Sequence, residues 1–220
     1  MMRKPRLLDL FCGAGGAAMG YARAGFDVVG VDIAPQPHYP YTFIQADALT
    51  FSLNGFDVIH ASPVCKGYTE LNAIGKEHHQ RLIPAMRDRL RQVNRPWVIE
   101  NVEGAIHSLP GSMTLCGSMF GLRIWRHRLF ESNCLLFAPG HCQHRNGCIG
   151  VYGQSIWDSS QRGKTRRDGR VRPAIVPLEI GALAMGIDRM TREELVQAIP
   201  PVYTAWLAPQ LLAYVESEAA

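Results

Sequence analysis

The chain has 220 residues and a formal net charge of only +4, so its overall charge gives little indication of a polyanionic partner. Its length suffices for one well-packed α/β domain with a small appendage. No apolar run reaches the roughly 18 residues that a membrane span needs, and the apolar stretch after residues 1–6 meets Asp9 too soon for a signal peptide. We therefore expect a cytoplasmic protein without a membrane partner, whose six cysteines are thiols or metal ligands rather than disulfides.

Short apolar segments and helical patterns alternate in the first part of the chain. Such alternation predicts a parallel sheet with helices on its faces. Gly25 follows the first helical pattern, in a position where glycine commonly ends a helix. The predicted strands are 6–11, 27–32, 43–45, 57–61 and 97–100, and the predicted helices are 17–24 and 77–93.

The character of the sequence changes after about residue 132. The segment 133–173 has little periodicity and is typical of a loop-rich insertion. Helical patterns then return, and in the second of them Thr191 and Glu194 have the spacing of a capping box. These C-terminal helices are predicted at 178–185, 191–198 and 202–215.

A glycine-rich loop, residues 9–16, joins the first strand to the first helix. Glycines in such a loop let the backbone approach a ligand closely, and the following helix N-terminus favours an anionic group. Asp32 ends the next strand, where an acidic residue often binds ribose hydroxyls. Asp47 follows the third strand and could accept a hydrogen bond from an adenine amino group. The order of these features favours a nucleotide-like cofactor over an ordinary turn with two solvated aspartates.

Cys65 follows the fourth strand in a loop of Pro, Lys and Gly, which favours an accessible thiol over a buried one. The carboxyl ends of strands are where open α/β sheets bind substrates. Glu100 ends the fifth strand at the same edge, where a raised pKa would let its carboxyl group donate a proton. Arg126 and Arg128 could add fixed hydrogen-bond donors or phosphate contacts.

Taken together, these motifs resemble those of the DNA (cytosine-5)-methyltransferases. The glycine loop matches their first motif, 63–69 their Pro-Cys loop, 100–102 their Glu-Asn-Val motif and 126–128 their Arg-x-Arg motif, in the same order along the chain. The resemblance implies an α/β fold with a doubly wound, mostly parallel sheet, Rossmann-like and of the S-adenosylmethionine-dependent methyltransferase type, with a small loop-rich insertion.

The resemblance also implies the roles of individual residues. It implies transfer of a methyl group from S-adenosylmethionine to carbon 5 of a flipped-out cytosine in double-stranded DNA. Cys65 would be the nucleophile, Glu100 the acid at ring nitrogen 3, and Arg126 and Arg128 the substrate-side donors. The implied cofactor contacts are Phe11, Gly13, Gly15, Asp32, Ile33, Asp47 and Pro63.

The resemblance divides the chain into three parts. Residues 1–132 would form the catalytic and cofactor-binding region, 133–173 a small target-recognition insertion, and 174–220 the helices that complete the catalytic domain. The insertion contains an arginine-rich stretch that we expect to contact phosphates rather than to form a merely solvated loop. Its predicted DNA contacts are Arg162, Lys164, Arg166, Arg167 and Arg170.

The sequence departs from the family pattern at several positions. Val64 and Lys66 flank the cysteine where the family has Pro and Gln, and Ile124 replaces a Gln before the two arginines. Residues 198–203 replace the usual Gly-Asn-Ser-Val motif. The charge of Lys66 raises the alternative of a carboxylated cofactor or an anionic base modification.

The insertion is short and rich in cysteine and histidine. Its candidate zinc ligands are Cys134, Cys142, His144 and Cys148, with His141 nearby. Their spacing is not that of a standard zinc finger, so a zinc site and a metal-free loop both remain open. A small recognition region resembles the compact enzymes found in phage genomes, and we expect a monomer acting in a bacterial or phage-infected cell.

Two other functions remain open at this point. The small recognition region favours the same chemistry on RNA or on a free cytosine nucleotide, although the basic stretch argues against a free nucleotide. The altered loop at 64–66 favours a nucleic-acid-binding protein that has lost turnover. The sequence also leaves open whether the protein serves restriction-modification or independent DNA methylation.

Overall fold

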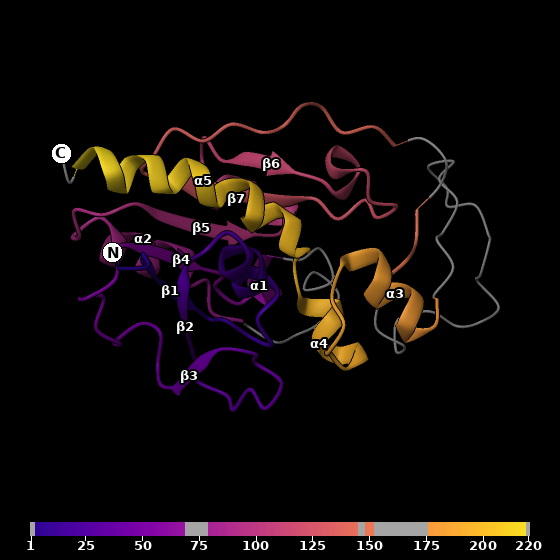
Figure 1. Ribbon diagram of the computed structural model, residues 1–220, viewed down its shortest axis with the longest axis horizontal. Helices are drawn as coiled ribbons and strands as arrows, with labels where there is room; N and C mark the ends of the chain where they lie inside the picture. The colour runs from indigo at the N-terminus through magenta and orange to yellow at the C-terminus, as the bar shows by residue number, and fades with distance from the viewer. Residues whose placement is uncertain (1–2, 69–78, 145–147, 152–175, 219–220) are drawn as a thin grey trace.

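The computed structural model describes residues 3–68, 79–144, 148–151 and 176–218. Seven strands of this part of the chain form one sheet, in the order β3-β2-β1-β4-β5-β7-β6 (Figure 1). The first five strands are parallel, whereas β7 runs antiparallel to β5 and β6 antiparallel to β7. The mostly parallel α/β sheet predicted from the sequence is therefore confirmed. The strands are β1 (Arg6–Leu10), β2 (Asp27–Asp32), β3 (Thr42–Gln45), β4 (Val58–Ala61), β5 (Trp97–Asn101), β6 (Met113–Leu115) and β7 (Arg128–Ser132).

The central strands are apolar because helices cover both of their faces. Every residue of β4 and β5 is buried, and so are four of the five residues of β1. By contrast, β6 and β7 lie at one side of the sheet and are only partly buried. Their short, mixed sequences gave no continuous apolar signal, and the sequence analysis predicted neither strand.

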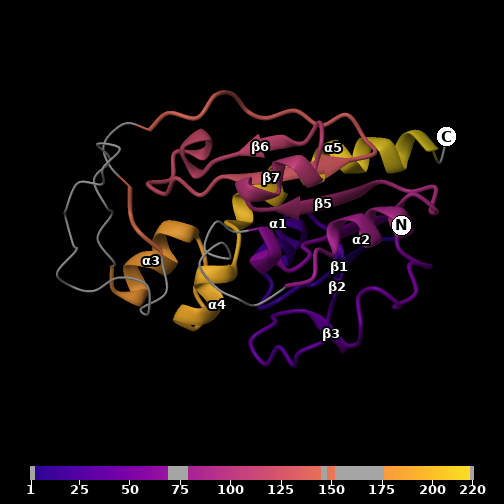
Figure 2. The ribbon, with the colours of Figure 1, turned by 180° about the vertical axis from the view of Figure 1, so that it is seen from behind.

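Helices pack on both faces of the sheet (Figures 1 and 2). The apolar sides of α1 and α5 pack on one face, together with Leu7, Val58 and Val98. On the opposite face, α2 packs with Leu8, Ile59 and others. The helices are α1 (Gly16–Arg23), α2 (Ile83–Leu90), α3 (Leu178–Met185), α4 (Arg192–Gln197) and α5 (Pro201–Glu218), and the short 3-10 helices are η1 (Cys65–Tyr68), η3 (Glu103–Ser108) and η4 (Gly117–Phe120).

The contact between α1 and α5 depends on a glycine. A Cβ atom at Gly20 would lie 2.0 Å from both the Pro201 carbonyl oxygen and Thr204 Oγ1. The Thr204 hydroxyl donates a hydrogen bond to the Ala17 carbonyl at 2.7 Å. The last helix is thus joined to the helix that follows the glycine loop, although the two are far apart in the sequence.

The small helices α3 and α4 lie at the end of the molecule opposite the two termini (Figure 1). Met185 and Leu195 pack there with Ala14 of the glycine loop. The predicted capping box is present: Glu194 N donates to Thr191 Oγ1 at 3.3 Å, and Thr191 N donates to Glu194 Oε2 at 2.7 Å. These helices therefore lie beside the edge of the sheet where the candidate site is located.

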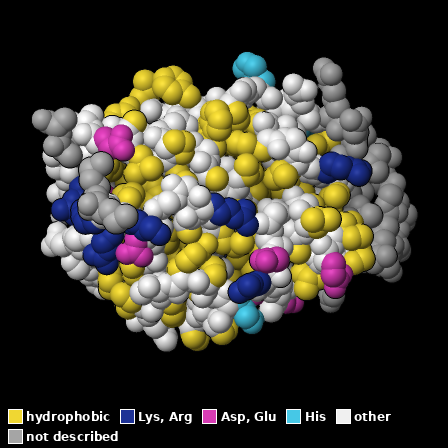
Figure 3. Space-filling view, viewed as in Figure 1, with side chains coloured by type: hydrophobic (Ala, Val, Ile, Leu, Met, Phe, Trp, Pro, Cys, Tyr) yellow, Lys and Arg dark blue, Asp and Glu magenta, His cyan; other side chains and the backbone are white. Residues whose placement is uncertain are grey.

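The predicted helix over 77–93 is shorter in the structure. Of its described part, only Ile83–Leu90 is α-helical, with Pro84 in the first turn, where proline is well tolerated. Among the residues that the structure describes, no helix is both long and apolar enough to cross a membrane. Figure 3 shows the face covered by α5, where apolar side chains are spread widely and many Lys and Arg side chains gather toward the end that holds the termini.

Candidate active site

The sheet brings the sequence-predicted residues to one edge, where the parallel strands end. Adjacent strands carry, in spatial order, Asp32 on β2, the glycine loop after β1, Cys65 after β4 and Glu100 on β5. Arg128 begins the antiparallel strand β7 at this same edge, because its strand pairs Leu129 with Asn101. This is the edge where open α/β sheets bind ligands.

The glycine loop turns sharply and is held by Asp32. Phe11, Gly13 and Gly15 have φ values of 56°, 48° and 91°, in the left-handed region. The Asp32 carboxylate accepts hydrogen bonds from Gly13 N and from Ala34 N, each at 3.0 Å. A Cβ atom at Gly13 would meet no other atom within 4 Å, so there is open space in front of the loop. The carboxylate thus fixes the loop and retains lone pairs for a ligand.

The neighbouring residues fit a nucleoside group. Ile33, directly after β2, is 71% exposed, which leaves an apolar side chain open to a flat ring. Asp47 is also exposed, and its Oδ1 accepts a hydrogen bond from Leu49 N at 2.8 Å. These residues follow adjacent strands, as the sequence analysis expected.

Cys65 is partly exposed at the start of η1, not buried in the core. The loop is attached to the neighbouring strand, because Asn101 Nδ2 donates to the carbonyl of the buried Pro63 at 2.7 Å. It is also attached to the region before α2, because Ile83 N donates to the Tyr68 hydroxyl at 3.2 Å. The cysteine thus lies at the sheet edge beside the strand that carries Glu100.

Glu100 and Arg128 form a buried ion pair. Arg128 Nε lies 3.1 Å from Glu100 Oε1, and the two side chains are 14% and 8% exposed. Burial raises the pKa of Glu100, whereas Arg128, a hydrogen bond from Ser62, and Arg126 partly oppose the increase. A carboxyl group with a raised pKa can hold a proton and donate it to a substrate.

A buried hydrogen-bond chain that the sequence analysis missed leads to Glu100. Tyr21 Oη lies 3.0 Å from His60 Nδ1, and His60 Nε2 lies 2.9 Å from Ser62 Oγ. Burial lowers the pKa of His60 to about 3, so its ring is neutral and has a single N–H. When Glu100 is ionised, Ser62 donates to it, so His60 Nε2 must donate to Ser62 and Nδ1 must accept from Tyr21. The signal in the sequence was weak: one polar residue, His60, within the apolar strand β4, and Ser62 directly after that strand.

Arg126 binds the backbone of the C-terminal region. Its guanidinium donates to the carbonyls of Val151 and Val196, and its own carbonyl accepts a hydrogen bond from the Tyr203 hydroxyl at 2.5 Å. This residue therefore joins the segment before β7 to α4 and α5. The predicted role of Arg126 as a substrate-side donor remains a prediction.

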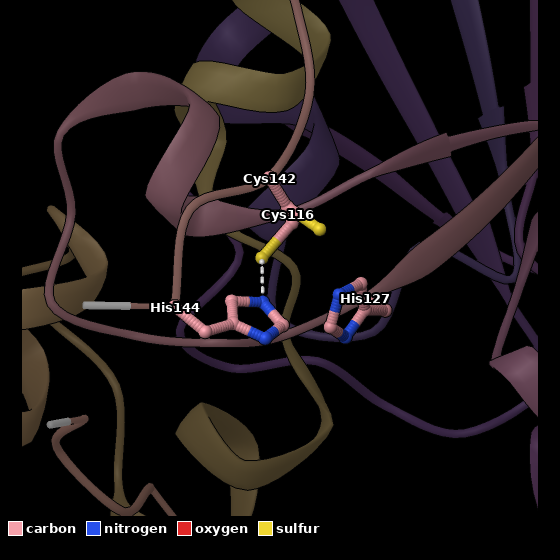
Figure 4. Close-up of side chains that lie close together, drawn as sticks. All are labelled: Cys116, His127, Cys142 and His144. Atoms are coloured by element: carbon pink, nitrogen blue, oxygen red, sulfur yellow. Dashed lines mark hydrogen bonds between the residues drawn. The ribbon is translucent and has the colours of Figure 1, made fainter.

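Two predicted sets of residues, the DNA contacts and the metal ligands, do not form part of the described site around Cys65 and Glu100. The predicted DNA contacts Arg162, Lys164, Arg166, Arg167 and Arg170 lie outside the described residues. Of the predicted metal ligands, Cys142 and His144 lie together with Cys116 and His127 (Figure 4). Cys134 and Cys148 do not belong to this group, so the clustered set differs from the predicted one.

Comparison with known proteins supports the fold. No protein-family model and no curated protein matches the sequence. The structure is similar to that of a protein described as a DNA modification methyltransferase encoded within an E. coli prophage, with a TM-score of 0.63 and 13% identity over 97% of this chain and 99% of that chain. It is also similar to the S. pombe Dnmt2 methyltransferase, with a TM-score of 0.61 and 15% identity over 97% and 99%. The Entamoeba histolytica methyltransferase EhMeth gives a TM-score of 0.57 and 12% identity over 100% of both chains.

These likenesses establish the fold of the chain. Its described residues form the Rossmann-like α/β sheet of these methyltransferases, as the resemblance of its motifs implied. Because all three identities are low, the chemistry of the site has to be argued from its own residues.

Proposed function

We propose that this protein transfers a methyl group from S-adenosylmethionine to carbon 5 of cytosine in DNA. The observation that carries the proposal is the order of groups along one sheet edge: Asp32, the glycine loop, Cys65, Glu100 and Arg128 follow adjacent strands. A cofactor held at β1 and β2 would then lie on one side of Cys65, and the Glu100–Arg128 pair on the other side. A pyrimidine ring next to Cys65 would then lie between the cofactor and the Glu100–Arg128 pair.

The cofactor would be held at the carboxyl ends of β1 and β2. The open loop at Gly13, the carboxylate of Asp32 and the exposed Ile33 fit the amino acid, ribose and adenine parts of S-adenosylmethionine. When bound, this cofactor supplies an electrophilic methyl group on a sulfonium sulfur. The residues Phe11, Gly15, Asp47 and Pro63 would complete the binding site.

The chemistry follows from the groups on either side of Cys65. Its thiolate adds to carbon 6 of cytosine, and Glu100 gives a proton to ring nitrogen 3, so that carbon 5 becomes nucleophilic. Carbon 5 takes the methyl group, and the electrons of the broken methyl–sulfur bond stay on the departing sulfur. A base then removes the proton from carbon 5, and the bond between carbon 6 and Cys65 Sγ breaks. This step restores the Cys65 thiolate, and the proton on ring nitrogen 3 returns to Glu100.

DNA as the substrate is supported by the basic segment 162–172 and by the description of one protein of similar structure. The E. coli prophage protein is described as a DNA modification methyltransferase. A cytosine inside a duplex can reach a nucleophile at the sheet edge only after it is flipped out of the base stack. The basic segment 162–172 would contact the phosphates.

The test is covalent capture on duplex DNA that contains 5-fluorocytosine, with S-adenosylmethionine present. The fluorine at carbon 5 cannot leave as a cation, so the adduct should persist and be visible on a denaturing gel. Cys65→Ser should abolish it, whereas Cys134→Ser, a change outside the site, should not. Failure of the wild-type chain to form an adduct with DNA would overturn the proposal, and an adduct only with RNA would reassign its substrate. Bisulfite sequencing of DNA from expressing cells would then give the target sequence.

A further inference from the structure

A second group of reactive side chains lies away from the glycine loop and Cys65. Cys116 is completely buried directly after β6, and His127 precedes β7. Cys142 and His144 come from the segment that follows β7, and both are exposed. Figure 4 shows that the four side chains converge on one region. One ligand atom from each of the four residues lies within 4.8 Å of all the others.

We propose that Cys116, His127, Cys142 and His144 bind one zinc ion. Two thiolates and two imidazoles are a donor set typical of tetrahedral structural zinc. Zinc bonds of about 2.0–2.3 Å place neighbouring ligand atoms about 3.3–3.8 Å apart. Cys116 Sγ and His144 Nε2 are already separated by 3.4 Å. Only small movements of the other side chains are needed to complete a tetrahedron.

Contacts around the four residues hold them in place for this role. The His144 ring stacks on Trp125, with centroids 4.5 Å apart, and meets the His127 ring edge to face at 4.9 Å. His127 Nδ1 lies 3.6 Å from Glu103 Oε2. A carboxylate on one ring nitrogen orients a histidine whose other nitrogen binds a metal. This contact therefore favours His127 Nε2 as the ligand atom.

The segment that carries Cys142 and His144 is also held at other points. Gln143 N donates to Ser118 Oγ at 3.0 Å, and this hydroxyl lies 3.3 Å from Cys116 Sγ. Earlier in the segment, Phe137 N donates to Gln210 Oε1 on α5 at 2.8 Å. Zinc would thus attach the segment after β7 to the β6–β7 pair. The inference does not depend on the proposed methyl transfer, because the four residues include none of its catalytic groups.

The experiment is metal analysis of the full chain, purified without chelators and after growth in zinc-supplemented medium. We expect about one zinc ion per chain by mass spectrometry. Cys142→Ser and His144→Asn should each lose most of the zinc, whereas Cys134→Ser should keep it. Because Cys142 and His144 are exposed, these variants should remain folded, and an unchanged circular dichroism spectrum would check this.

Cobalt substitution tests the ligand set. The Co²⁺-loaded chain should show the intense visible d–d bands of a tetrahedral site and a thiolate-to-metal charge-transfer band. At Co²⁺ concentrations that saturate the variant, Cys142→Ser should reduce the charge-transfer band per bound Co²⁺ by about half, since one of two thiolates is lost, while Cys148→Ser should leave it unchanged. The proposal is wrong if the wild-type chain binds neither zinc nor Co²⁺. It is also wrong if Cys148→Ser removes the band and Cys142→Ser does not.

Discussion

Arg128 Nε lies 3.1 Å from Glu100 Oε1, and this contact joins the last parallel strand of the sheet to the antiparallel strand beside it. Glu100 is buried, and Arg128 does not fully offset the cost of burying its carboxylate, because the pKa of Glu100 is still raised. Glu100 is held both by the Arg128 cation and by a hydrogen bond from the Ser62 hydroxyl.

The first prediction concerns stability as a function of pH. Because the pKa of Glu100 is raised on folding, its contribution to stability is present below its unfolded pKa and is lost as the pH rises through its folded pKa. We expect Glu100→Gln to gain stability relative to the wild type as the pH rises through this window, since glutamine has no charge to bury. Urea unfolding of both proteins at several pH values measures the difference, and two parallel stability curves would contradict the prediction. The same variant should lose about 10²–10⁴-fold in methyl transfer if Glu100 acts as the acid.

The second prediction concerns the hydrogen-bond chain below Glu100. The Ser62 hydroxyl lowers the pKa of Glu100, so Ser62→Ala should raise it and move the alkaline limb of the rate–pH profile to higher pH. His60 stays neutral and still contacts Tyr21, so the chain is interrupted at one point only. The control is Ser52→Ala, whose exposed hydroxyl accepts a hydrogen bond from Asn54 N far along the chain from Glu100. An unchanged alkaline limb in Ser62→Ala would show that the hydroxyl does not tune the acid.

A third prediction concerns cofactor binding. Asp32 accepts hydrogen bonds from Gly13 N and Ala34 N, so it both orders the loop and offers lone pairs to the ribose. We expect Asp32→Ala to weaken S-adenosylmethionine binding by at least about tenfold, since hydrogen bonds to a charged group are each worth about 1.5–3 kcal/mol. Isothermal titration calorimetry measures this loss. Asp27→Ala, at the opposite end of the same strand, is the matched control and should bind as the wild type does.

A fourth prediction concerns the packing of α1 on α5. Gly20→Ala should raise helix propensity by about 1 kcal/mol, but its Cβ would clash with Pro201 and Thr204. Overpacking usually costs about 1–3 kcal/mol or more, so we expect a net loss of stability. Chemical denaturation measures whether the free energy of unfolding rises or falls in Gly20→Ala. It therefore shows whether the gain in helix propensity or the clash is larger. Ala22→Gly, in the same helix, is the comparison without a clash: it lowers helix propensity and removes one partly buried methyl group but adds no atom.

Much of the fold could be predicted from the sequence because the signals were local. Four of the five parallel strands, β1, β2, β4 and β5, are mostly apolar and buried, which is the pattern that burial on both faces requires. The capping box of α4 was predicted from two residues, Thr191 and Glu194, that contact each other within one turn. Residues at the ends of parallel strands must share one edge, so Asp32, Cys65 and Glu100 could be placed there before their distances were known.

Other features depend on contacts between segments that are distant in the sequence, and only the tertiary structure decided them. The short strands β6 and β7 are stabilised by pairing with β5, not by a pattern of their own, and this pairing brings Arg128 to Glu100. The cluster of Cys116 and His127 with Cys142 and His144 arises in the same way. Cys116 directly follows β6 and His127 directly precedes β7, whereas Cys142 and His144 lie two residues apart in the segment after β7. The pairing of β6 with β7 and the path of the chain after β7 bring the four residues together.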